Sequence, residues 1–441
     1  MKVLRILGLF MISVFILVWI LATRKEPSET APLATATPVP QLPSNLDATV
    51  DISQAGEHLI GIRVVDGEGE FFNRSTGEKF IPRGMNYVRL GGQVLWDGSS
   101  NFGHNMFDPG KYNAPKIDLD LNIMHTNGYN VARVFISPDM IGTQSGGLSF
   151  AYMKNVADFL QRAEKNHIQV IFTLDRIPDG KYGEILLEDC CTIFALMNSN
   201  FLPPAGLKAN QAFFKDFITD LLSLNAPTGV IFSYELRNEL FFDSDQAPFT
   251  MTTGVVRTAN GKMYDMADPS SKDLMMKENL VYWINEVRTA IREVDPTALV
   301  SVGFAVPQGP NPTRPGDPRT SISEPAIWSS DADFVDLHAF VSPELSLQQY
   351  AENFGINDMK TKPIIMGEYG AEVMLFDTAQ AAGIRIRDWQ TESCAYGFDG
   401  WLFWTWDTDE QPELFNAMMD VGIINKTLAP ENVPAPCLPV P

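Results

Sequence analysis

The sequence predicts an α/β fold, a (β/α)8 TIM barrel in a single domain, and two observations lead to this prediction. Between residues 58 and 428, short runs rich in Val, Ile and Phe alternate with longer amphipathic stretches. Near-continuous apolar strands separated by helices indicate a parallel sheet that is covered on both faces. The apolar runs number eight, and eight parallel strands with crossovers between them make up a (β/α)8 barrel.

The expected strands are, in chain order, 79–88, 129–137, 168–175, 229–236, 298–304, 333–340, 363–370 and 400–406. Helical patterns between them cover 153–167, 210–224, 280–294 and 379–393. The alternative is a doubly wound sheet, which normally carries a Gly-rich phosphate loop after its first strand. Here the first strand ends in RGMNYVRLGG. That stretch lacks the GxGxxG order, so the barrel is favoured.

The two ends of the chain differ in composition from the 58–428 barrel domain. The apolar run 6–22 follows a basic N-terminus, and as a helix it would cover roughly 25 Å, which is short for a bilayer span. We interpret residues 1–22 as an uncleaved signal anchor, with a cleaved signal peptide as the alternative. Residues 23–57 form a Pro/Ala/Thr-rich linker and residues 429–441 a Pro-rich C-terminal tail, and neither composition can bury a core.

These features predict a location at the cell membrane, single-pass with an extracytoplasmic barrel domain, or secretion if the N-terminal segment is cleaved. The membrane is therefore an expected partner through the N-terminal helix. The chain has 54 acidic and 33 basic residues, for a formal net charge of -21. Phosphate neutralisation needs a basic face, so no nucleic-acid partner is expected. A neutral substrate fits this composition better.

The cysteines do not indicate a metal site. The chain has four, and no CxxC pair or Cys/His cluster with zinc spacing occurs among them. A disulfide could join Cys394 to Cys437, or one of these to the adjacent pair Cys190 and Cys191. Buried free thiols are an equally good interpretation, because cysteine is among the most buried residue types.

Polar and aromatic residues stand at the carboxyl-terminal ends of several expected strands, where an apolar core has no use for them. In a (β/α)8 barrel these strand ends meet at one mouth, where the chemistry of such barrels takes place. The candidate functional residues are Arg133 in the second strand, Asn238 and Glu239 after the fourth, His338 in the sixth, Glu368 in the seventh and Trp404 in the eighth.

Glu239 and Glu368 suggest a particular chemistry. Two carboxyls that face each other across a polar pocket suit cleavage of a glycosidic bond, because one must be protonated to assist the leaving oxygen while the other is ionised. Burial can raise one pKa while a nearby Arg favours the charged form of the other. Arg133 is the expected electrostatic partner of Glu368. The plainer alternatives are a structural ion pair for Glu239 and a helix-terminal acid for Glu368.

At these residues the sequence resembles clan A of the glycoside hydrolases, most closely family 5, the cellulase and mannanase family. The matching stretches are GYNVAR at 128–133, Glu235 with RNE at 237–239, the His of the sixth strand, GEYG at 367–370 and GWLFWTW at 400–406. Each motif is short, but five in the right order at successive strand ends form a specific signal. The resemblance covers residues 60–425.

The resemblance implies a barrel without metal or organic cofactor that acts on a β-linked oligo- or polysaccharide. It implies that Glu239 is the acid/base and Glu368 the nucleophile of a retaining glycosidase, which cleaves O-glycosidic bonds by double displacement. Asn238 would bind the sugar 2-hydroxyl, and Trp404 would form the floor under the reacting sugar. The expected substrate-binding residues are Arg133, Asn238, His338 and Trp404.

The sequence departs from the family pattern at three positions. Phe340 stands where the family usually has a Tyr whose hydroxyl contacts the nucleophile, so Glu368 must be oriented by another group, for which Arg133 is the candidate. Arg176 replaces the His found after the third strand in many subfamilies, and Leu240 replaces the Pro that often follows the acid/base. Neither catalytic carboxyl is lost.

Phe340 supports the main alternative, a non-catalytic carbohydrate-binding surface protein on a degenerate barrel. A metal-dependent barrel hydrolase is less favoured, because such enzymes use several His ligands and only His338 of the five histidines stands at a strand end. The long segment 241–271 contains an Asn-Gly hairpin signal, and we expect it to be an insertion that shapes the cleft. Trp96 and Trp328 are weaker candidates for outer subsites.

Overall fold

In the computed structural model of this chain, the residues that can be described are 55–94, 100–143, 146–188, 193–305 and 316–438. The expected anchor, nearly all of the linker, Trp96 and the pair Cys190 and Cys191 lie outside these ranges. In the described part of the chain, no helix is both long enough and apolar enough to cross a membrane.

The central element is a parallel sheet that closes on itself. Its strand order is β12-β8-β7-β6-β3-β17-β16-β15-β13. The first and last strands in this order, β12 and β13, are separated in sequence only by Val302 and are two parts of the fifth barrel strand. The eight-stranded barrel predicted from the sequence is therefore confirmed. The strands are β3 (Arg83–Asn86), β6 (Val131–Ile136), β7 (Gln169–Leu174), β8 (Ile231–Glu235), β12 (Val300–Ser301), β13 (Gly303–Phe304), β15 (Val335–His338), β16 (Ile364–Tyr369) and β17 (Phe398–Trp404).

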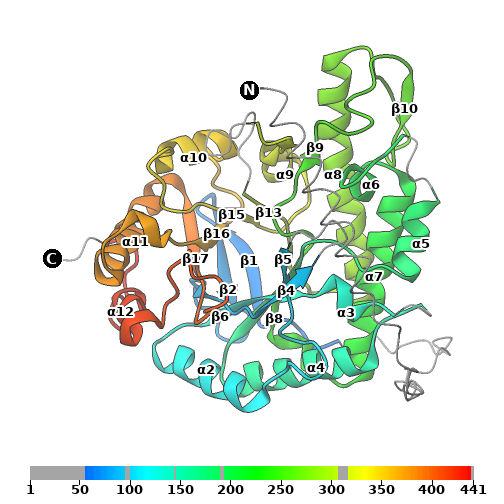
Figure 1. Cartoon of the computed structure of the whole chain (residues 1–441). Coiled ribbons are helices and arrows are strands. Elements are labelled where there is room, and N and C mark those ends of the chain that lie inside the picture. The colour runs from blue at the N-terminus through cyan, green and yellow to red at the C-terminus, as the bar shows by residue number, and fades with distance from the viewer. Residues whose placement is uncertain (1–54, 95–99, 144–145, 189–192, 306–315, 439–441) are drawn as a thin grey trace, which may run out of the picture. The chain divides into compact units, whose positions relative to one another are not determined.

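Helices surround this barrel, as Figure 1 shows. The principal ones are α2 (Ala114–Thr126), α4 (Phe150–Lys165), α7 (Pro204–Ser223), α8 (Pro269–Val294), α9 (Ser323–Ser329), α10 (Leu347–Phe354), α11 (Ala379–Ser393) and α12 (Met419–Leu428). Shorter helices are α3 (Pro138–Ile141), α5 (Lys181–Leu187) and α6 (Asn198–Phe201). Helix α10 illustrates how the sequence sets the ends of a helix: it begins at a capping box of Ser346 and Gln349 and ends at Gly355, whose φ is 71°.

The largest apolar core lies between the sheet and these helices. Val134 and Phe172 point outward from β6 and β7 and belong to the same buried cluster as Leu121 of α2 and Phe159 of α4. The opposite faces of the same strands point into the barrel. Alternation along a strand thus assigns one set of residues to the helix layer and the other to the barrel interior.

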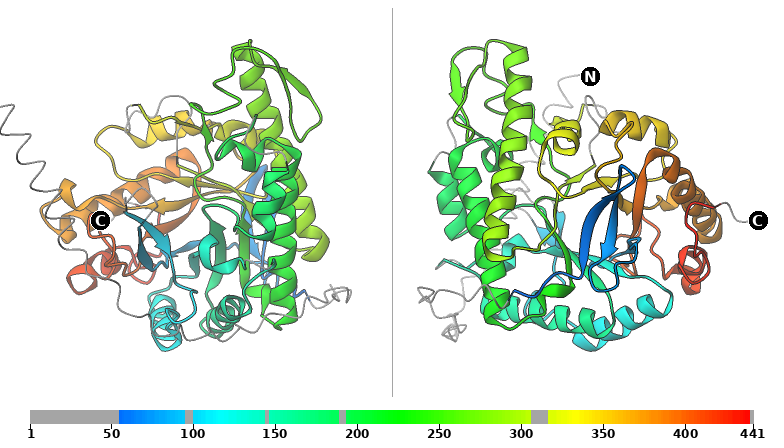
Figure 2. Two further views of the ribbon diagram at one scale, coloured as in Figure 1. Left: turned by 45° about the vertical axis from the view of Figure 1, so that its right-hand side comes forward. Right: turned by 180° about the vertical axis from the view of Figure 1, so that it is seen from behind.

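One end of the barrel interior is apolar and closed. Strands β1 (Ile60–Val65) and β2 (Glu68–Asn73) form an antiparallel hairpin, which lies across the barrel in the rear view of Figure 2. Ile60 and Phe71 of this hairpin pack in one buried cluster with barrel residues, namely Val131, Ile171, Phe232, Leu299, Phe334, Ile365 and Leu402. This cluster, the apolar floor, seals the end of the barrel at which the strands begin.

Smaller sheets stand at the other end and beside it. Strands β4 (Leu90–Val94) and β5 (Ser100–His104) form a hairpin in the connection after β3. Strands β10 (Val255–Arg257) and β11 (Met263–Asp265) form the hairpin expected in the 241–271 segment, with its turn at Gly261, φ 77°. Strand β9 (Phe242–Asp243) of the same segment pairs with β14 (Arg319–Thr320).

The C-terminal tail packs on the barrel over its described part, which differs from the expectation for a Pro-rich segment. Val433 is buried, and the guanidinium of Arg83 donates hydrogen bonds to the carbonyls of Val433 and Leu428. A disulfide joins Cys394 to Cys437, which decides among the pairings that the sequence left open. The disulfide and the arginine supply contacts that the segment's own composition does not show.

Candidate active site

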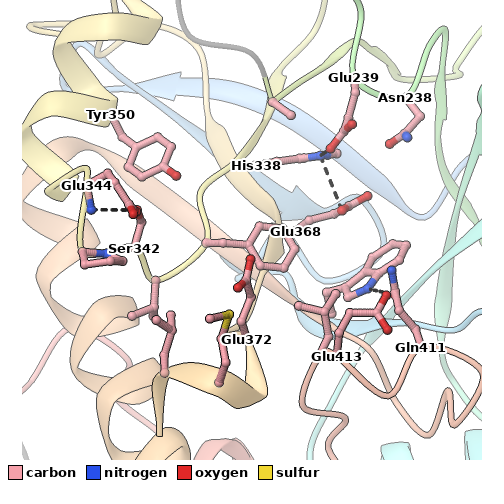
Figure 3. A pocket seen from close by; sticks show the side chains of 18 of the residues that line it. Asn238, Glu239, His338, Ser342, Glu344, Tyr350, Glu368, Glu372, Gln411 and Glu413 are labelled. Atoms are coloured by element: carbon pink, nitrogen blue, oxygen red, sulfur yellow. Dashed lines mark hydrogen bonds and ion pairs between the residues drawn. The ribbon is translucent and has the colours of Figure 1, made fainter. Parts of the chain in front are cut away.

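The carboxyl-terminal ends of the barrel strands surround a pocket of about 630 Å³. Five of the six residues singled out in the sequence analysis line or border it, and Arg133 lies beneath it. Figure 3 shows Glu239, His338 and Glu368 pointing toward one another within this pocket. The predicted residues among those that line the pocket are Asn238, Glu239, His338, Glu368 and Trp404.

Arg133 organises the layer under the pocket. It stands in β6, is fully buried, and donates from Nη1 to Glu368 Oε1 at 2.7 Å and from Nη2 to Asn238 Oδ1 at 2.7 Å. It also donates to Asn86 Oδ1 at 2.9 Å. The expected contact between Arg133 and Glu368 is thus present. The guanidinium acts on the pocket through the lining residues Glu368, Asn238 and His338, whose Nε2 lies 3.4 Å from Arg133 Nη2.

Glu235 is the second partner of this arginine and lies deeper than the pocket. Arg133 Nη2 donates to its Oε1 at 2.7 Å and Nε to its Oε2 at 3.1 Å. Thr173 adds a hydroxyl donor at 2.7 Å. A carboxylate with two guanidinium contacts is strongly held in its charged form. The structural role expected for Glu235, deep in the barrel beside an arginine, is consistent with these contacts.

Glu239 stands just past the end of β8, where the chain turns away from the barrel. Its φ is 44°, a conformation that few residues other than glycine adopt and that is concentrated at functional sites. Its side chain keeps 31% of its surface exposed, and His338 Nδ1 lies 3.1 Å from its Oε1. Glu239 is therefore the solvent-facing member of the carboxyl pair.

Glu368 is the buried member of the pair. It stands in β16, and its side chain is only 6% exposed. Its pKa is raised to about 7, chiefly by burial; His338 and Arg133 lower the pKa, and the negative charge of Glu239 raises it. One carboxylate oxygen of each glutamate and one ring nitrogen of His338 lie within 4.8 Å of one another. Two carboxyls this close interact as a pair and retain one proton more readily than either would alone.

Asn238 is fixed from two sides. Its Oδ1 accepts from Arg133, and its Nδ2 donates to Asp175 Oδ1 at 2.9 Å. Asp175 follows β7 and also lies 3.5 Å from His104 Nε2. The amide of Asn238 is thus oriented with its remaining hydrogen-bonding capacity available at the pocket.

Trp404 forms part of the pocket wall at the end of β17. Its indole Nε1 donates to Gln411 Oε1 at 2.8 Å, and its ring meets that of Phe135 edge-on at 5.8 Å between centroids. The side chain is largely buried but one part reaches the pocket. A rigidly held aromatic ring of this kind offers a flat apolar surface.

The three departures from the family pattern fall at different depths. Phe340 lines the pocket and has no hydroxyl, and Glu368 is held instead by Arg133. Arg176 pairs with Asp139 and Asp179. Leu240 is buried, and its amide donates to Gly303. None of the three removes a contact that Glu239 or Glu368 makes.

The other candidates from the sequence lie outside the pocket. Trp328 is exposed on α9, where its Nε1 donates to the carbonyl of Gly355. Of the described residues, none from 241–271 lines the pocket. The segment contributes through β9, which pairs with β14 and so supports Arg319, a residue that does line it.

Among the described residues, two groups of side chains bring three possible metal-ligand atoms within 4.8 Å: Glu235, Asp336 and His338, and Glu239, His338 and Glu368. In the first group Glu235 already accepts from Arg133 and Thr173. In the second, Glu368 accepts from Arg133. Because the guanidinium supplies the positive charge in both groups, a metal ion would have to compete with it.

Sequence reasoning missed several residues of the site. His104 belongs to the β4–β5 hairpin and stacks on Phe135 at 3.8 Å between centroids; burial lowers its pKa to about 4, so it is neutral. No local signal marks it. Three further carboxylates that line the pocket were also missed: Glu344, Glu372 and Glu413. These were easier to predict than His104, because they lie in the loops that follow strand ends.

Comparison with known structures shows that the fold of this chain is shared with solved glycosidases. A glycoside hydrolase family 5 mannosidase from Rhizomucor miehei matches with a TM-score of 0.53 and 15% identity, over 86% of this chain and 99% of that one. The chain has the fold of family 5 mannosidases. An endo-β-1,4-mannanase from Thermotoga petrophila matches with a TM-score of 0.51 and 16% identity, over 81% of this chain and 78% of that one.

A third match has a longer chain than this one. The exo-β-1,4-mannosidase Op5Man5 from an Opitutaceae bacterium, strain TAV5, has a TM-score of 0.52 and 17% identity; the match covers 83% of this chain but 59% of that enzyme. No family model and no protein of curated function matches the sequence. The likeness to family 5 therefore concerns the fold, in agreement with the resemblance that the strand-end motifs indicated.

Proposed function

We propose that this protein is a retaining glycoside hydrolase that cleaves β-linked oligo- or polysaccharides. The observation that supports this most directly is the close approach of Glu239 and Glu368, with carboxylate oxygens within 4.8 Å. Retaining enzymes hold their two carboxyls about 5–5.5 Å apart, whereas inverting enzymes need about 6.5–9.5 Å for an intervening water. The close approach of the two carboxyls favours a double displacement over direct attack by water.

In the first step Glu368 attacks the anomeric carbon while Glu239 gives its proton to the leaving glycosidic oxygen. The bond from the sugar to the leaving oxygen breaks, and an ester bond to Glu368 forms. In the second step Glu239, now ionised, takes a proton from water, and that water displaces Glu368 from the sugar. After the second step both glutamates are back in their starting states, Glu239 protonated and Glu368 ionised.

The environments of the two glutamates support this division of roles. The exposed carboxyl of Glu239 faces the solvent side, from which the leaving group departs and water arrives. Glu368 accepts a guanidinium hydrogen bond from Arg133, which favours the ionised form that a nucleophile needs. The negative charge of Glu239 raises the pKa of Glu368. When Glu239 is protonated it has no charge, and Glu368 ionises more readily.

The other pocket residues suit a sugar. Asn238 is held so that its amide can contact a hydroxyl beside the reacting carbon, and Trp404 offers a flat apolar surface to the C–H face of a pyranose ring. The solved proteins with this fold are named as mannanases and mannosidases. β-1,4-Mannans and mannooligosaccharides are therefore the first substrates to assay, followed by other β-glycans.

Replacement of each glutamate by glutamine tests the proposal. Glu239→Gln should lower kcat on natural glycans by about 10²–10⁴-fold, and less on aryl glycosides whose leaving group needs no proton. Glu368→Gln should abolish turnover on both kinds of substrate, because no covalent intermediate can form. Glu413→Gln is the matched control, since Glu413 lines the same pocket away from the pair. Wild-type levels of hydrolysis in either catalytic variant would refute the assignment.

The second candidate function is carbohydrate binding without turnover, and Phe340 is the observation that favours it. Glycan binding by wild type together with no hydrolysis of any glycan or aryl glycoside would establish it. The contact between Arg133 and Glu368 argues against this candidate, because a binding protein has no need of a guanidinium that favours the ionised form of a carboxyl buried beside a second carboxyl.

We also propose that the protein is exported and stays at the membrane through its N-terminal segment. The disulfide between Cys394 and Cys437 supports export, because such bonds persist in oxidising compartments. Fractionation of cells that express the full chain tests this: we expect the protein in the membrane fraction and accessible to protease from outside. Recovery in the cytosol with both thiols reduced would contradict it.

A further inference from the structure

A buried carboxyl lies directly under the proposed catalytic pair, and the steps described so far do not use it. Asp336 belongs to β15 and is fully buried. Neighbouring strands leave room for it and for Glu235: a Cβ on Gly367 would lie 1.7 Å from Asp336 Oδ1, and one on Gly303 would lie 2.7 Å from Glu235 Oε1. Both glycines thus make space for a carboxyl inside the barrel.

The hydrogen bonds of Arg133 leave no proton for Asp336. A guanidinium has five N–H groups, and here they serve Glu368 and Asn86 from Nη1, Glu235 and Asn238 from Nη2, and Glu235 again from Nε. Asp336 Oδ2 lies 3.5 Å from Nε, farther away than the Glu235 oxygen that this N–H already serves.

No described residue donates a hydrogen bond to either carboxyl oxygen of Asp336. An ionised carboxylate in such a place would be buried without a donor and beside the charge of Glu235, which is costly. Burial and the charge of Glu235 raise the pKa of Asp336 well above its ordinary range, with Arg133 opposing. The neutral acid avoids this cost, because its O–H can be donated to His338 Nε2, 3.6 Å from Oδ1, whereas Glu235 already accepts three hydrogen bonds from Arg133 and Thr173.

His338 lies between Asp336 and the pair of glutamates. Its Nε2 faces Arg133 Nη2 at 3.4 Å and Asp336 Oδ1 at 3.6 Å. Its Nδ1 faces Glu239 Oε1 at 3.1 Å and Glu368 Oε2 at 3.6 Å. With Asp336 protonated, Nε2 faces an acid O–H and the positively charged guanidinium of Arg133, both of which disfavour a proton on Nε2, while both groups near Nδ1 are acceptors.

We propose that Asp336 is a positioning residue: as a neutral acid it keeps His338 in the tautomer that carries its proton on Nδ1, so that this single N–H is directed at Glu239 and Glu368. An ionised Asp336 would instead attract a proton to Nε2 and leave a lone pair facing the glutamates. The tautomer itself follows from the contacts of His338, and its meaning for catalysis rests on the proposed function.

This arrangement compensates for the missing hydroxyl at Phe340. Arg133 serves Glu368 Oε1, and Oε2 faces the ring Nδ1 of His338 at 3.6 Å. The N–H on that nitrogen also faces Glu239, so it supports whichever glutamate is ionised at a given step. The charged and titratable groups that surround Asp336 and influence its protonation are Arg133 on β6, Glu235 on β8, His338 on β15 and Glu368 on β16.

Nitrogen NMR of the full chain labelled with ¹⁵N-histidine tests the tautomer without any substrate. The chain has five histidines, and the spectrum of a His338→Gln variant identifies the signals of His338. We expect wild type near neutral pH to show a protonated Nδ1 and an unprotonated Nε2. A protonated Nε2 would overturn the proposal, whatever the enzymatic activity proves to be.

Two substitutions at Asp336 test whether its role depends on a negative charge or on a neutral hydrogen-bond donor. Asp336→Asn keeps a neutral donor of the same size, so His338 should keep its tautomer and kcat/KM and its pH profile should stay close to those of wild type. An acidic limb displaced to lower pH in this variant would overturn the proposal, since Asp336 would then have carried a charge. Asp336→Ala removes the donor, and kcat should fall by about 10–100-fold with KM little changed.

Asp295→Asn is the matched control, because Asp295 contacts His58 Nε2 at 2.8 Å and is equally buried, away from the pocket. It should lower stability without moving the His338 signals or the pH profile. If Asp336→Ala fails to fold, the wild-type spectrum and the Asp336→Asn pH profile still decide the question. Failure of the proposed function would appear as absent hydrolysis in wild type, with the tautomer unaffected.

Discussion

The barrel interior contains two successive layers whose chemistry is opposite. The apolar floor consists of residues such as Val131 and Phe334, packed under the β1–β2 hairpin. Two positions farther along the same strands stand Arg133 and Asp336, in a layer that is just as buried but charged. We call this second set, Arg133, Glu235, Asp336, His338 and Glu368, the charged layer. One strand therefore serves both layers, and the side-chain period of two keeps both inside the barrel.

The difference shows what each layer needs in order to exist. The floor requires only that its side chains fill the space, since apolar burial has no directional demand. The charged layer requires every donor and acceptor to be matched, because a buried charge without a partner costs several kcal/mol. One guanidinium supplies most of that matching. We expect substitutions in the floor to change stability alone, and substitutions that remove a donor or an acceptor from the charged layer to change activity as well.

The largest effect should follow from Arg133→Lys. A lysine has three donors in a compact group and cannot reach Glu235, Glu368, Asn86 and Asn238 together. We expect a loss of about 3–5 kcal/mol in the free energy of unfolding, because buried carboxylates are left without partners. Hydrolysis should be lost as well. Urea unfolding monitored by tryptophan fluorescence and kcat/KM on an aryl glycoside give the two measurements.

Arg83→Lys is the matched control for that substitution. Arg83 is also a buried arginine, on β3, but it donates to the carbonyls of Leu428 in α12 and Val433 in the tail, outside the barrel interior. It should lower stability and leave kcat/KM unchanged. Equal loss of activity in both variants would mean that the charged layer has no special link to the reaction, and the comparison of the two layers would fail.

Phe334→Ala should have an effect on stability of similar size, without an effect on the chemistry. Phe334 packs against Phe71 at 5.2 Å and Phe232 at 5.4 Å between ring centroids. Truncation leaves a cavity in the floor and should cost about 3–5 kcal/mol. At a temperature where the variant is folded, kcat/KM and its pH profile should match wild type. A shifted pH profile would show that the two layers are coupled through β15.

The two layers also differed in how far the sequence predicted them. The apolar runs predicted the barrel, and strand-end residues such as Glu239 and Glu368 were identified because their polarity breaks the run. Asp336 was not, because it lies inside the run DFVDLHAF, and a lone acid there has no local signal of its function. Only the closed sheet shows that Gly367 of the next strand makes room for it.

Residues that come from loops were predictable only in part. His104 reaches the pocket from a hairpin whose path depends on tertiary packing, so no periodicity in the sequence placed it there. The packing of the tail was also missed, because its anchors, the Arg83 guanidinium and the disulfide at Cys437, are contacts between distant segments. Hydrophobic pattern predicts which face of an element is buried, and it does not predict which distant polar group meets it.

The smallest effect, and the sharpest test of the cost of the charged layer, is the pH dependence of stability in Glu368→Gln. The pKa of Glu368 in the folded protein is raised to about 7 from an ordinary 4.5. The folded state therefore binds a proton more tightly than the unfolded state, and this group's contribution to stability falls as pH rises from about 4.5 to about 7. Glutamine removes that dependence. The variant should exceed wild type in stability by about 3 kcal/mol near pH 8, with the difference vanishing near pH 4. Glu413→Gln, at the exposed rim, should show no such trend.

A Glu368→Gln protein less stable than wild type at pH 8 would mean that the bond from Arg133 outweighs the cost of burying this carboxylate, and that the charged layer stabilises the barrel instead of weakening it.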